Sequence, residues 1–456
     1  MAKVKKAYFC QSCGAESAKW LGRCPSCGEW NTLVEEVVSK LVETVKGISA
    51  GTSRPTLIDE VEMEQVARIN MGSKEMNRIL GGGLVPGSLV LIAGEPGIGK
   101  STLSLQLTLN RPELKTLYVS GEESVQQIKL RAERLGGSGS GCYLLSETNL
   151  ESILIQTKVL RADMIVVDSI QTLFSERVES SPGSVSQIRE CAVRLLKYAK
   201  ETNTPIFLIG HITKDGTIAG PKVLEHIVDV VLQFEGDGNY LYRILRSVKN
   251  RFGSTAEIGI FEMLGSGLRE VENPSEILIS HRNESLSGVA IAATMDGVRP
   301  FLIETQGLVS TAAYGVPQRS TTGFDVRRMN MLLAVLEKRA GFRLAAKDVF
   351  LNIAGGLKVT DPAIDLAVVS AVLSSNLDVP IPAGCCFSAE VGLTGEIRPV
   401  PHVDQRIAEA ARLGFKRIFV SSYNHKISEV SAKGIEVVTV GRIEELMRKL
   451  FGKESE

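Results

Sequence analysis

The chain has 456 residues, 52 of them Lys or Arg and 52 Asp or Glu, and it is 44% hydrophobic and 23% charged. Such proportions exclude a disordered or collagen-like chain, and at roughly 150 residues per domain the length predicts about three folded units. The net charge of zero gives no overall attraction to nucleic acid or to a membrane, so either partner would need a local basic surface.

Residues 1–30 carry a metal-binding pattern, Cys-x2-Cys-x10-Cys-x2-Cys, in which each pair places two thiolates on one tight turn. Sulfur ligands favour Zn²⁺, and a full set leaves no open coordination position, so we expect a structural site. Two redox pairs, or a chance pairing of the cysteines, are the alternatives. No apolar leader follows the basic N-terminus, which predicts a cytoplasmic protein without membrane contact, where thiols stay reduced. The predicted ligands are Cys10, Cys13, Cys24 and Cys27.

Aromatic and basic residues surround these cysteines. Lys19, Trp20, Arg23 and Trp30 would suit a contact with nucleic acid or with protein, and an ordinary charged surface is the alternative. Residues 31–68 show no sustained period, which predicts a linker with a short strand or two.

Residues 69–272 alternate apolar runs with helical patterns, which predicts an α/β domain with a mostly parallel sheet covered on both faces. Helices are expected from Ser101 and from Ser124. Strands are expected at residues 89–93, 116–120, 164–168 and 205–210.

A phosphate-binding loop of the pattern G-x4-G-K-[ST] joins the first of these strands to its helix. Its backbone N–H groups would surround the phosphates at the helix N-terminus, and its lysine would meet the β and γ phosphates. We therefore predict that ATP binds here and that the hydroxyl of Ser101 holds Mg²⁺. The loop consists of Gly94, Glu95, Pro96, Gly97, Ile98, Gly99, Lys100 and Ser101, and Thr102 follows it.

Carboxylates follow two of the other strands. Asp168 is predicted to be the acidic Mg²⁺ ligand, and a helix cap is the alternative. Glu122 and Glu123 are expected at the same edge of the sheet, where one of them would polarise the attacking water. The sequence does not decide which one does so, and an acidic pair that merely favours the next helix is the alternative.

Asn273 and Pro274 mark the next boundary, and residues 275–456 again mix strands with helices. This pattern predicts a further α/β or α+β domain. Strands are expected at residues 288–293, 301–305, 417–421 and 436–440, and helices at residues 327–340, 363–374 and 403–413.

The glycine-rich run before the phosphate loop and the acidic run after the next strand resemble the ATPase core of RecA-class recombinases and of KaiC. Residues 355–365 and 393–401 resemble the proteolytic domain of Lon. Together with the cysteine block, the order of these modules is similar to the bacterial RadA (Sms) family over essentially the whole chain. The first two runs are Gly81, Gly82, Gly83, Leu84, Val85, Pro86, Gly87 and Ser88, and Gly121, Glu122, Glu123 and Ser124.

This resemblance implies a DNA-repair ATPase that forms a hexameric ring around DNA. It further implies branch migration of recombination intermediates alongside the RecA recombinase, single-stranded and branched DNA as substrates, and ATP, Mg²⁺ and Zn²⁺ as cofactors. Composition and spacing by themselves do not point to DNA.

One further motif belongs to the same resemblance. In this motif, residues 249–253, the side chains of Lys249 and Arg251 would reach the γ-phosphate of a neighbouring subunit or a DNA phosphate. A solvated basic turn is the alternative. The motif consists of Lys249, Asn250, Arg251, Phe252 and Gly253.

Polar loops in RecA-like rings face the central channel. Residues 175–186 and 211–222 are therefore candidate channel loops, with Lys214 and Lys222 as candidate contacts to DNA phosphates.

Cleavage by the Lon pattern needs a serine nucleophile and a lysine base. The resemblance places Ile364 at the serine and Arg406 at or beside the lysine, and an arginine stays protonated. We therefore expect a non-proteolytic scaffold for ring assembly or DNA binding. An ATP-gated adaptor or regulator is the rival function, and an ATP-dependent protease is disfavoured. A basic cluster in this region would offer DNA a surface or be a solvated helix face: Arg327, Arg328, Lys338, Arg339, Arg343 and Lys347.

Overall fold

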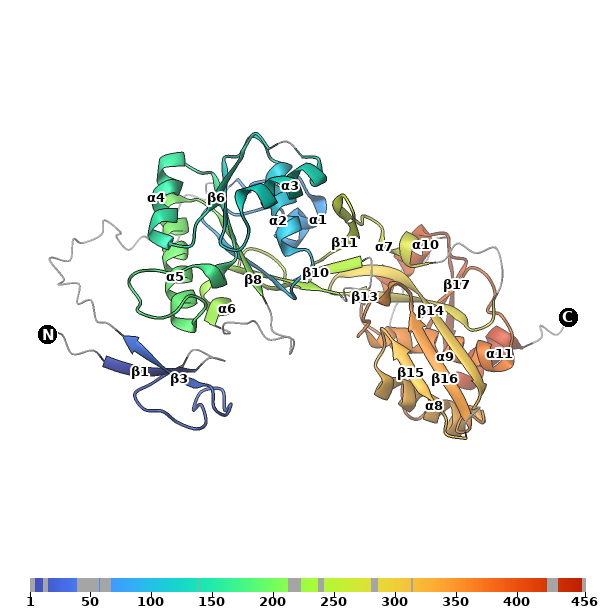
Figure 1. Cartoon of the computed structure of the whole chain (residues 1–456). Coiled ribbons are helices and arrows are strands. Elements are labelled where there is room, and N and C mark those ends of the chain that lie inside the picture. Colours follow the sequence, from blue (N-terminus) through green and yellow to red (C-terminus); the bar gives the residue numbers. More distant parts are fainter. Residues whose placement is uncertain are drawn as a thin grey trace. The chain divides into compact units, whose positions relative to one another are not determined.

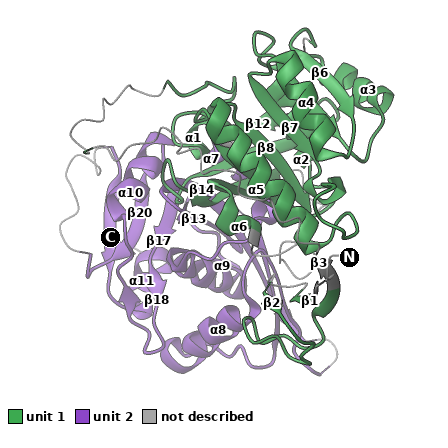
Figure 2. Cartoon of the chain, turned by 90° about the vertical axis from the view of Figure 1, so that its left-hand side faces the viewer, with its two compact units in different colours: residues 1–270 green, residues 271–456 purple. Residues whose placement is uncertain are grey.

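The computed structural model (Figure 1) describes residues 5–10, 15–38, 57, 67–137, 139–211, 223–236, 242–279, 286–312, 315–424 and 434–452. The chain divides into two compact units, residues 1–270 and residues 271–456, which Figure 2 colours green and purple. Within the described residues no helix is both long enough and apolar enough to cross a membrane.

The cysteine block forms a small antiparallel sheet in the order β2-β1-β3. Its strands are β1 (Lys5–Cys10), β2 (Glu16–Ser17) and β3 (Leu33–Val38). Cys10, Cys24 and Leu33 make up the buried core of this sheet. A core of this size is too small to stabilise a fold by itself, so a bound metal would have to contribute. Because β3 pairs with β1, this sheet extends past residue 30 into the region predicted as a linker.

The large sheet of the first unit has nine strands in the order β12-β11-β10-β9-β4-β8-β7-β5-β6. Neighbours from β9 to β6 are parallel, and β10, β11 and β12 extend the sheet in antiparallel fashion. This confirms the predicted α/β class with a mostly parallel sheet. The strands are β4 (Leu89–Gly94), β5 (Thr116–Ser120), β6 (Cys142–Ser146), β7 (Met164–Asp168), β8 (Ile206–His211), β9 (Val230–Glu235), β10 (Tyr242–Asn250), β11 (Ile258–Leu264) and β12 (Gly267–Glu270).

Helices cover both faces of this sheet, as its continuous apolar strands predict. In β4, Val90 and Ile92 pack into one core cluster, while Leu89 and Leu91 pack into the other. The first cluster is covered by α1 (Lys74–Ile79), α2 (Lys100–Leu109) and α3 (Val125–Leu135), and the second by α4 (Leu150–Leu160), α5 (Val185–Thr202) and α6 (Val223–Ile227), as Figure 1 shows. A short 3-10 turn, η2 (Ile170–Thr172), follows β7.

The strand register fixes which residues meet at each edge of the sheet. Gly94 at the end of β4 pairs with His211 at the end of β8, and Ser120 at the end of β5 pairs with Asp168 at the end of β7. The residues after these strands therefore share one edge, called here the carboxyl edge. β10 runs antiparallel to β9 and ends with Asn250 opposite Val230, near the start of β4, so it ends at the opposite, amino edge.

The second unit is built on a mixed sheet of seven strands in the order β15-β16-β14-β13-β17-β20-β21, beside a pair formed by β18 and β19. The strands are β13 (Val289–Asp296), β14 (Arg299–Thr311), β15 (Arg319–Thr322), β16 (Lys347–Ile353), β17 (Cys385–Ser388), β18 (Glu390–Val391), β19 (Ile397–Arg398), β20 (Arg417–Ser421) and β21 (Glu436–Val440). The helical elements are α7 (Pro274–Leu278), α8 (Val326–Ala340), η3 (Ala354–Gly356), η4 (Pro362–Ile364), α9 (Asp365–Leu377), α10 (Val403–Arg412) and α11 (Ile443–Phe451).

Helix α9 packs on β13 and β14, and residues 365–374 of this helix are all buried. The helix comes so close that a Cβ added to Gly307 of β14 would lie 3.2 Å from the carbonyl carbon of Ala371. Helix α10 packs into a separate core cluster with Ala293, Leu302 and Ile418. Together these two helices cover apolar residues of the sheet.

Candidate functional site

Three of the predicted zinc ligands lie together. The sulfur atoms of Cys10, Cys24 and Cys27 are all within 4.8 Å of one another, and those of Cys10 and Cys27 are 3.7 Å apart. Sulfur atoms held about 2.3 Å from one tetrahedral ion lie about 3.8 Å from each other, so the group fits zinc. Gly28, with φ of +76°, turns the chain beside Cys27 and donates its N–H to the carbonyl of Cys24. The fourth predicted ligand, Cys13, lies outside the described residues.

The phosphate-binding loop curls at the carboxyl edge between β4 and α2. Gly97 and Gly99 have φ of +77° and +117°, a region that L side chains rarely adopt. A Cβ added to Gly97 would meet no protein atom within 4 Å, whereas one on Gly94 would lie 2.9 Å from Cβ of Phe234. The loop is thus packed on the protein at Gly94 and open at Gly97, as an anion-binding cradle requires.

Lys100 begins α2 and turns back into this loop. Its Nζ donates to the carbonyl oxygens of Gly94, at 2.8 Å, and of Glu95, at 2.9 Å. The residue is only 4% exposed. Burial lowers the pKa of Lys100 to about 8, against the opposing effect of the carboxylates of Asp168, Glu122 and Glu95. Ser101 and Thr102 follow in the first turn of α2 and are half-buried.

Asp168 ends β7 and is buried at the same edge. The hydroxyl of Tyr118, a fully buried residue of β5, donates to Oδ2 of Asp168 at 2.8 Å. Burial and the neighbouring carboxylate of Asp168 hold the pKa of Tyr118 well above its usual value, so the phenol keeps its proton and remains a donor. A carboxylate fixed in this way beside a phosphate loop has the donor chemistry that Mg²⁺ prefers.

The two consecutive glutamates after β5 point to different partners. Glu122 accepts a hydrogen bond from the hydroxyl of Ser169 at 2.7 Å, and its Oε1 lies 3.4 Å from Nε2 of His211. Glu123 instead forms an ion pair with Arg131 of α3. Glu122 therefore faces the strand ends that carry the phosphate loop and Asp168, while Glu123 helps to attach α3.

Tyr118 and Ser169 were not predicted as site residues, and His211 was predicted only as the start of a candidate channel loop. An aromatic residue inside an apolar strand such as β5 has the pattern of ordinary core, so no signal marked Tyr118. The polar residues at the ends of β7 and β8 carried a usable signal, because carboxyl ends of parallel strands meet at one edge.

The predicted motif at residues 249–253 lies at the amino edge. The Nζ of Lys249 donates to the carbonyls of Glu225, at 2.6 Å, and Val228, at 2.8 Å. Nη1 of Arg251 lies 3.3 Å from Oδ1 of the buried Asp229, although the arginine side chain is 54% exposed. Since β10 ends at the edge opposite the phosphate loop, these cations do not lie beside the phosphate loop of their own chain.

The rest of the motif is attached to the glycine-rich run before β4. Asn250 donates from Nδ2 to the carbonyl of Ile79 at 3.1 Å and accepts from the backbone N–H of Phe252 at 2.8 Å. A Cβ added to Gly253 would lie 3.0 Å from Cα of Gly81, so the two backbones touch. The two segments can lie this close only because Gly81 and Gly253 have no side chains.

Of the two candidate channel loops, the structure describes residues 175–186 and not residues 212–222, so Lys214 and Lys222 lie outside the described residues. The buried Gln187 holds the first loop in place. Its Nε2 donates to the carbonyls of Ser175, Val178 and Ser180, and its Oε1 accepts from the backbone N–H of Ser175.

Comparisons with known proteins find family models for three parts of the chain and full-length relatives. Family models match at residues 8–35 (rubredoxin metal binding domain), 58–217 (AAA domain) and 304–424 (subunit ChlI of Mg-chelatase). The DNA repair protein RadA of Bacillus subtilis is 49% identical over 99% of this chain and 100% of its own length. That of Listeria monocytogenes is 49% identical over 98% of this chain and 99% of its own. The chain belongs to the RadA family.

A KaiC-like protein, PH0186 of Pyrococcus horikoshii, is 21% identical, with a TM-score of 0.38 over 45% of this chain and 99% of its own. A likeness this loose adds nothing to the assignment. The similarity to RadA proteins covers the C-terminal unit as well, which contains the segments that resemble Lon.

In this RadA-family chain, the two positions that the resemblance to Lon assigns to the dyad hold a buried hydrophobic residue and a buried ion pair. Ile364 is fully buried. Arg406 is 2% exposed, and its Nη1 donates to Oδ2 of Asp361 at 2.6 Å and to the carbonyl of Ala293 at 3.0 Å. Burial alone would raise the pKa of Asp361, but the hydrogen bond and charge of Arg406, with backbone N–H groups, lower it below its usual value. Neither position offers a nucleophile or a base.

The basic cluster of the second unit is not one continuous free surface. Arg328 forms ion pairs with the buried Asp365 and with Glu390, and Nζ of Lys347 donates to Asn376 at 2.6 Å. Arg327, Lys338, Arg339 and Arg343 are exposed. Part of the predicted cluster therefore has a structural role.

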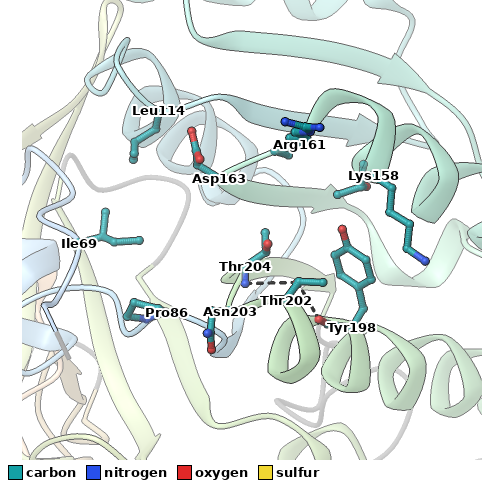
Figure 3. Close-up of a pocket in the computed structure, with 12 residues that line it drawn as sticks. Ile69, Pro86, Leu114, Lys158, Arg161, Asp163, Tyr198, Thr202, Asn203 and Thr204 are labelled. Atoms are coloured by element: carbon teal, nitrogen blue, oxygen red, sulfur yellow. Dashed lines mark hydrogen bonds between the residues drawn. The ribbon is translucent and has the colours of Figure 1, made fainter. Parts of the chain in front are cut away.

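A pocket of about 540 Å³ opens at the amino edge of the large sheet (Figure 3). Its lining includes Leu114, Asp163 and Thr204, which precede β5, β7 and β8. The hydroxyl of Thr202 donates to the carbonyl of Tyr198 at 2.8 Å in its wall. Because this pocket lies at the edge opposite the phosphate loop, it is not the nucleotide site.

Proposed function

We propose that this chain is an ATP-hydrolysing motor that acts on single-stranded and branched DNA in recombinational repair. The observation that carries this proposal is the convergence of Lys100, Asp168 and Glu122 at the carboxyl edge of the large sheet. Full-length similarity to proteins named DNA repair protein RadA supports DNA as the substrate.

The residues at this edge suit transfer of a phosphoryl group to water. The loop N–H groups and Lys100 would bind the β and γ phosphates. Ser101 and Asp168 would hold Mg²⁺, which supplies positive charge against the charge of the transferred group. Glu122, held by the hydroxyl of Ser169, would accept the proton of the attacking water.

A second copy of the chain would complete this site. Lys249 and Arg251 lie at the edge opposite their own phosphate loop, so a role at a γ-phosphate would have to be exerted on a neighbour. Such a head-to-tail contact closes into a ring when its rotation allows. We therefore propose a hexameric ring around DNA, which promotes branch migration with the RecA recombinase as partner.

We also propose that the second unit is a non-proteolytic scaffold for this ring, because Ile364 and Arg406 leave it without a dyad. The cysteine group suits Zn²⁺ as a structural ion and requires reduced thiols, as in the cytoplasm.

The test is ATP hydrolysis by the full chain with and without single-stranded DNA. A motor should hydrolyse ATP faster when DNA is present, and Lys100→Ala should abolish turnover in both conditions. If saturating single-stranded DNA does not change the rate of ATP hydrolysis, the result would favour the ATP-gated adaptor instead. A casein-type unfolded substrate should stay intact with and without ATP.

A further inference from the structure

The zinc-binding block exposes both tryptophans of the chain. The sequence contains two in total, Trp20 and Trp30. They are 55% and 69% exposed, although indole rings are normally largely buried. Large exposed aromatic residues that gather on one surface mark a contact site.

The two indoles converge on one point of the backbone. A Cβ added to Gly22 would lie 3.8 Å from Cη2 of Trp20 and 3.7 Å from Cζ3 of Trp30. The isolated bridge between Arg23 and Trp30 brings the two segments together across the metal-binding turns. The metal-binding fold thus holds two mostly solvent-exposed rings side by side.

The side chain of Arg23 lies beside one of the two rings. The guanidinium carbon of Arg23 lies 5.9 Å from the ring centroid of Trp30, within range of a cation–π contact. Its Nε donates to the carbonyl of Gly28 at 2.8 Å, in the turn that follows Cys27. The exposed Lys19 adds a second positive charge next to Trp20 in the sequence.

We propose that Trp20 and Trp30 form a stacking platform for the bases of single-stranded DNA, with Arg23 and Lys19 beside the phosphates. The inference rests on the proposed action on DNA and assigns part of it to this block. Exposed aromatic rings interleaved with cations match a ligand that alternates π-faces with negative charges. Stacking tolerates any base sequence, as a motor that moves along DNA requires.

The composition of the chain provides the experiment. Because its only tryptophans lie in this platform, intrinsic tryptophan emission of the full-length chain reports on the platform alone. An oligonucleotide of deoxythymidine should quench this emission in a saturable way. An abasic oligonucleotide of the same length carries the same phosphates without bases and should leave the emission nearly unchanged.

Variants separate stacking from other causes. Trp20→Ala and Trp30→Ala should each weaken binding of labelled oligo(dT), followed by fluorescence anisotropy, by about tenfold, which corresponds to roughly 1.4 kcal/mol. Trp20→Phe and Trp30→Phe keep a ring and should retain most of the affinity. Leu21→Ala removes an apolar side chain that is 42% exposed between them and is the matched control. Bound zinc, measured for each variant, shows that the block still folds.

Each outcome is decisive. Oligo(dT) that binds the chain without changing its emission would overturn the platform and leave the proposed action on DNA intact. A chain that binds no DNA at all would overturn both. Emission that responds to a RecA-type recombinase but not to DNA would make this surface a protein contact and overturn the proposal.

Discussion

At the scale of single residues, the chemistry of the candidate site depends on which side chains face the phosphate loop, and Glu122 does so while Glu123 pairs with Arg131. The loop has a fixed spacing, because the phosphates require backbone N–H groups at set positions. The choice between Glu122 and Glu123 depends instead on the direction in which each side chain leaves a turn, which no spacing encodes. Tyr118 lies in a run of buried residues, and only the pairing of β5 with β7 shows that its hydroxyl reaches Asp168.

The two glutamates give the first prediction. Glu122→Gln should lower ATP turnover by about 100-fold or more and keep ATP binding, because a general base typically contributes 10² to 10⁴ in rate. Glu123→Gln is the matched control and should retain most turnover, since Glu123 pairs with Arg131. Steady-state hydrolysis and binding of a labelled nucleotide measure the two effects, and the reverse ranking would contradict the assignment.

Lys100 gives a prediction about pH. Its pKa in the nucleotide-free protein is about 8, and bound phosphates favour the charged form. ATP affinity should therefore be insensitive to this group below pH 8 and fall by about tenfold per pH unit above it, until the pKa of the complex is reached. Isothermal titration calorimetry between pH 7 and about 9.5 measures this fall. Lys100→Ala should bind ATP weakly and lose that slope; an identical slope in the variant would assign it to another group.

At the scale of elements, strands made of unbroken runs of β-branched and other apolar residues were the easiest to predict. The expected strands at 116–120, 164–168, 417–421 and 436–440 have the same bounds in the structure. Strands β6 and β17 were not singled out, because β6 has no buried residue and β17 has only four residues. The antiparallel extension β10 to β12 depends on pairing between distant segments, which local pattern does not show.

Helix α10 carries a prediction about stability. Arg406→Met should leave Asp361 buried without its partner and lower the free energy of unfolding by about 3–5 kcal/mol. Arg412→Met on the same helix removes an exposed arginine and should change it by about 0.5 kcal/mol or less. Denaturant unfolding of the full chain measures both, and equal effects would contradict a special role for the buried pair.

The ion pair of Arg406 and Asp361 also makes the free energy of unfolding depend on pH in the acidic range. The folded-state pKa of Asp361 is lower than its usual value of 3.8, so its contribution is fully present above that value. The contribution should disappear as the pH falls through the lower folded value. Arg406→Met should therefore flatten this part of the stability profile below about pH 4.

At the scale of the whole molecule, the proposed assembly would place the two edges of the large sheet from neighbouring chains at one reaction site. An Arg251→Ala chain keeps its phosphate loop, and a Lys100→Ala chain keeps its motif at residues 249–253. Each variant alone should be nearly inactive. A mixture with excess Lys100→Ala protein should recover hydrolysis, because each Arg251→Ala loop then meets an intact arginine.

The matched control is a chain with both substitutions. Mixed with Arg251→Ala protein, it supplies neither a functional loop nor an arginine and should restore nothing. Absence of recovery in the first mixture, when both variants are shown to assemble, would assign Arg251 to a DNA phosphate or to an ordinary surface turn.

The position of β10 also has a kinetic consequence. If Arg251 and the phosphate loop of one chain lie at opposite edges of the sheet, an isolated subunit has no arginine at its own nucleotide site. Hydrolysis per chain should then rise steeply with protein concentration and level off once assembly is complete, with no change in any residue. Dilution alone would switch the enzyme off, so the cell could regulate this activity simply through the abundance of the chain.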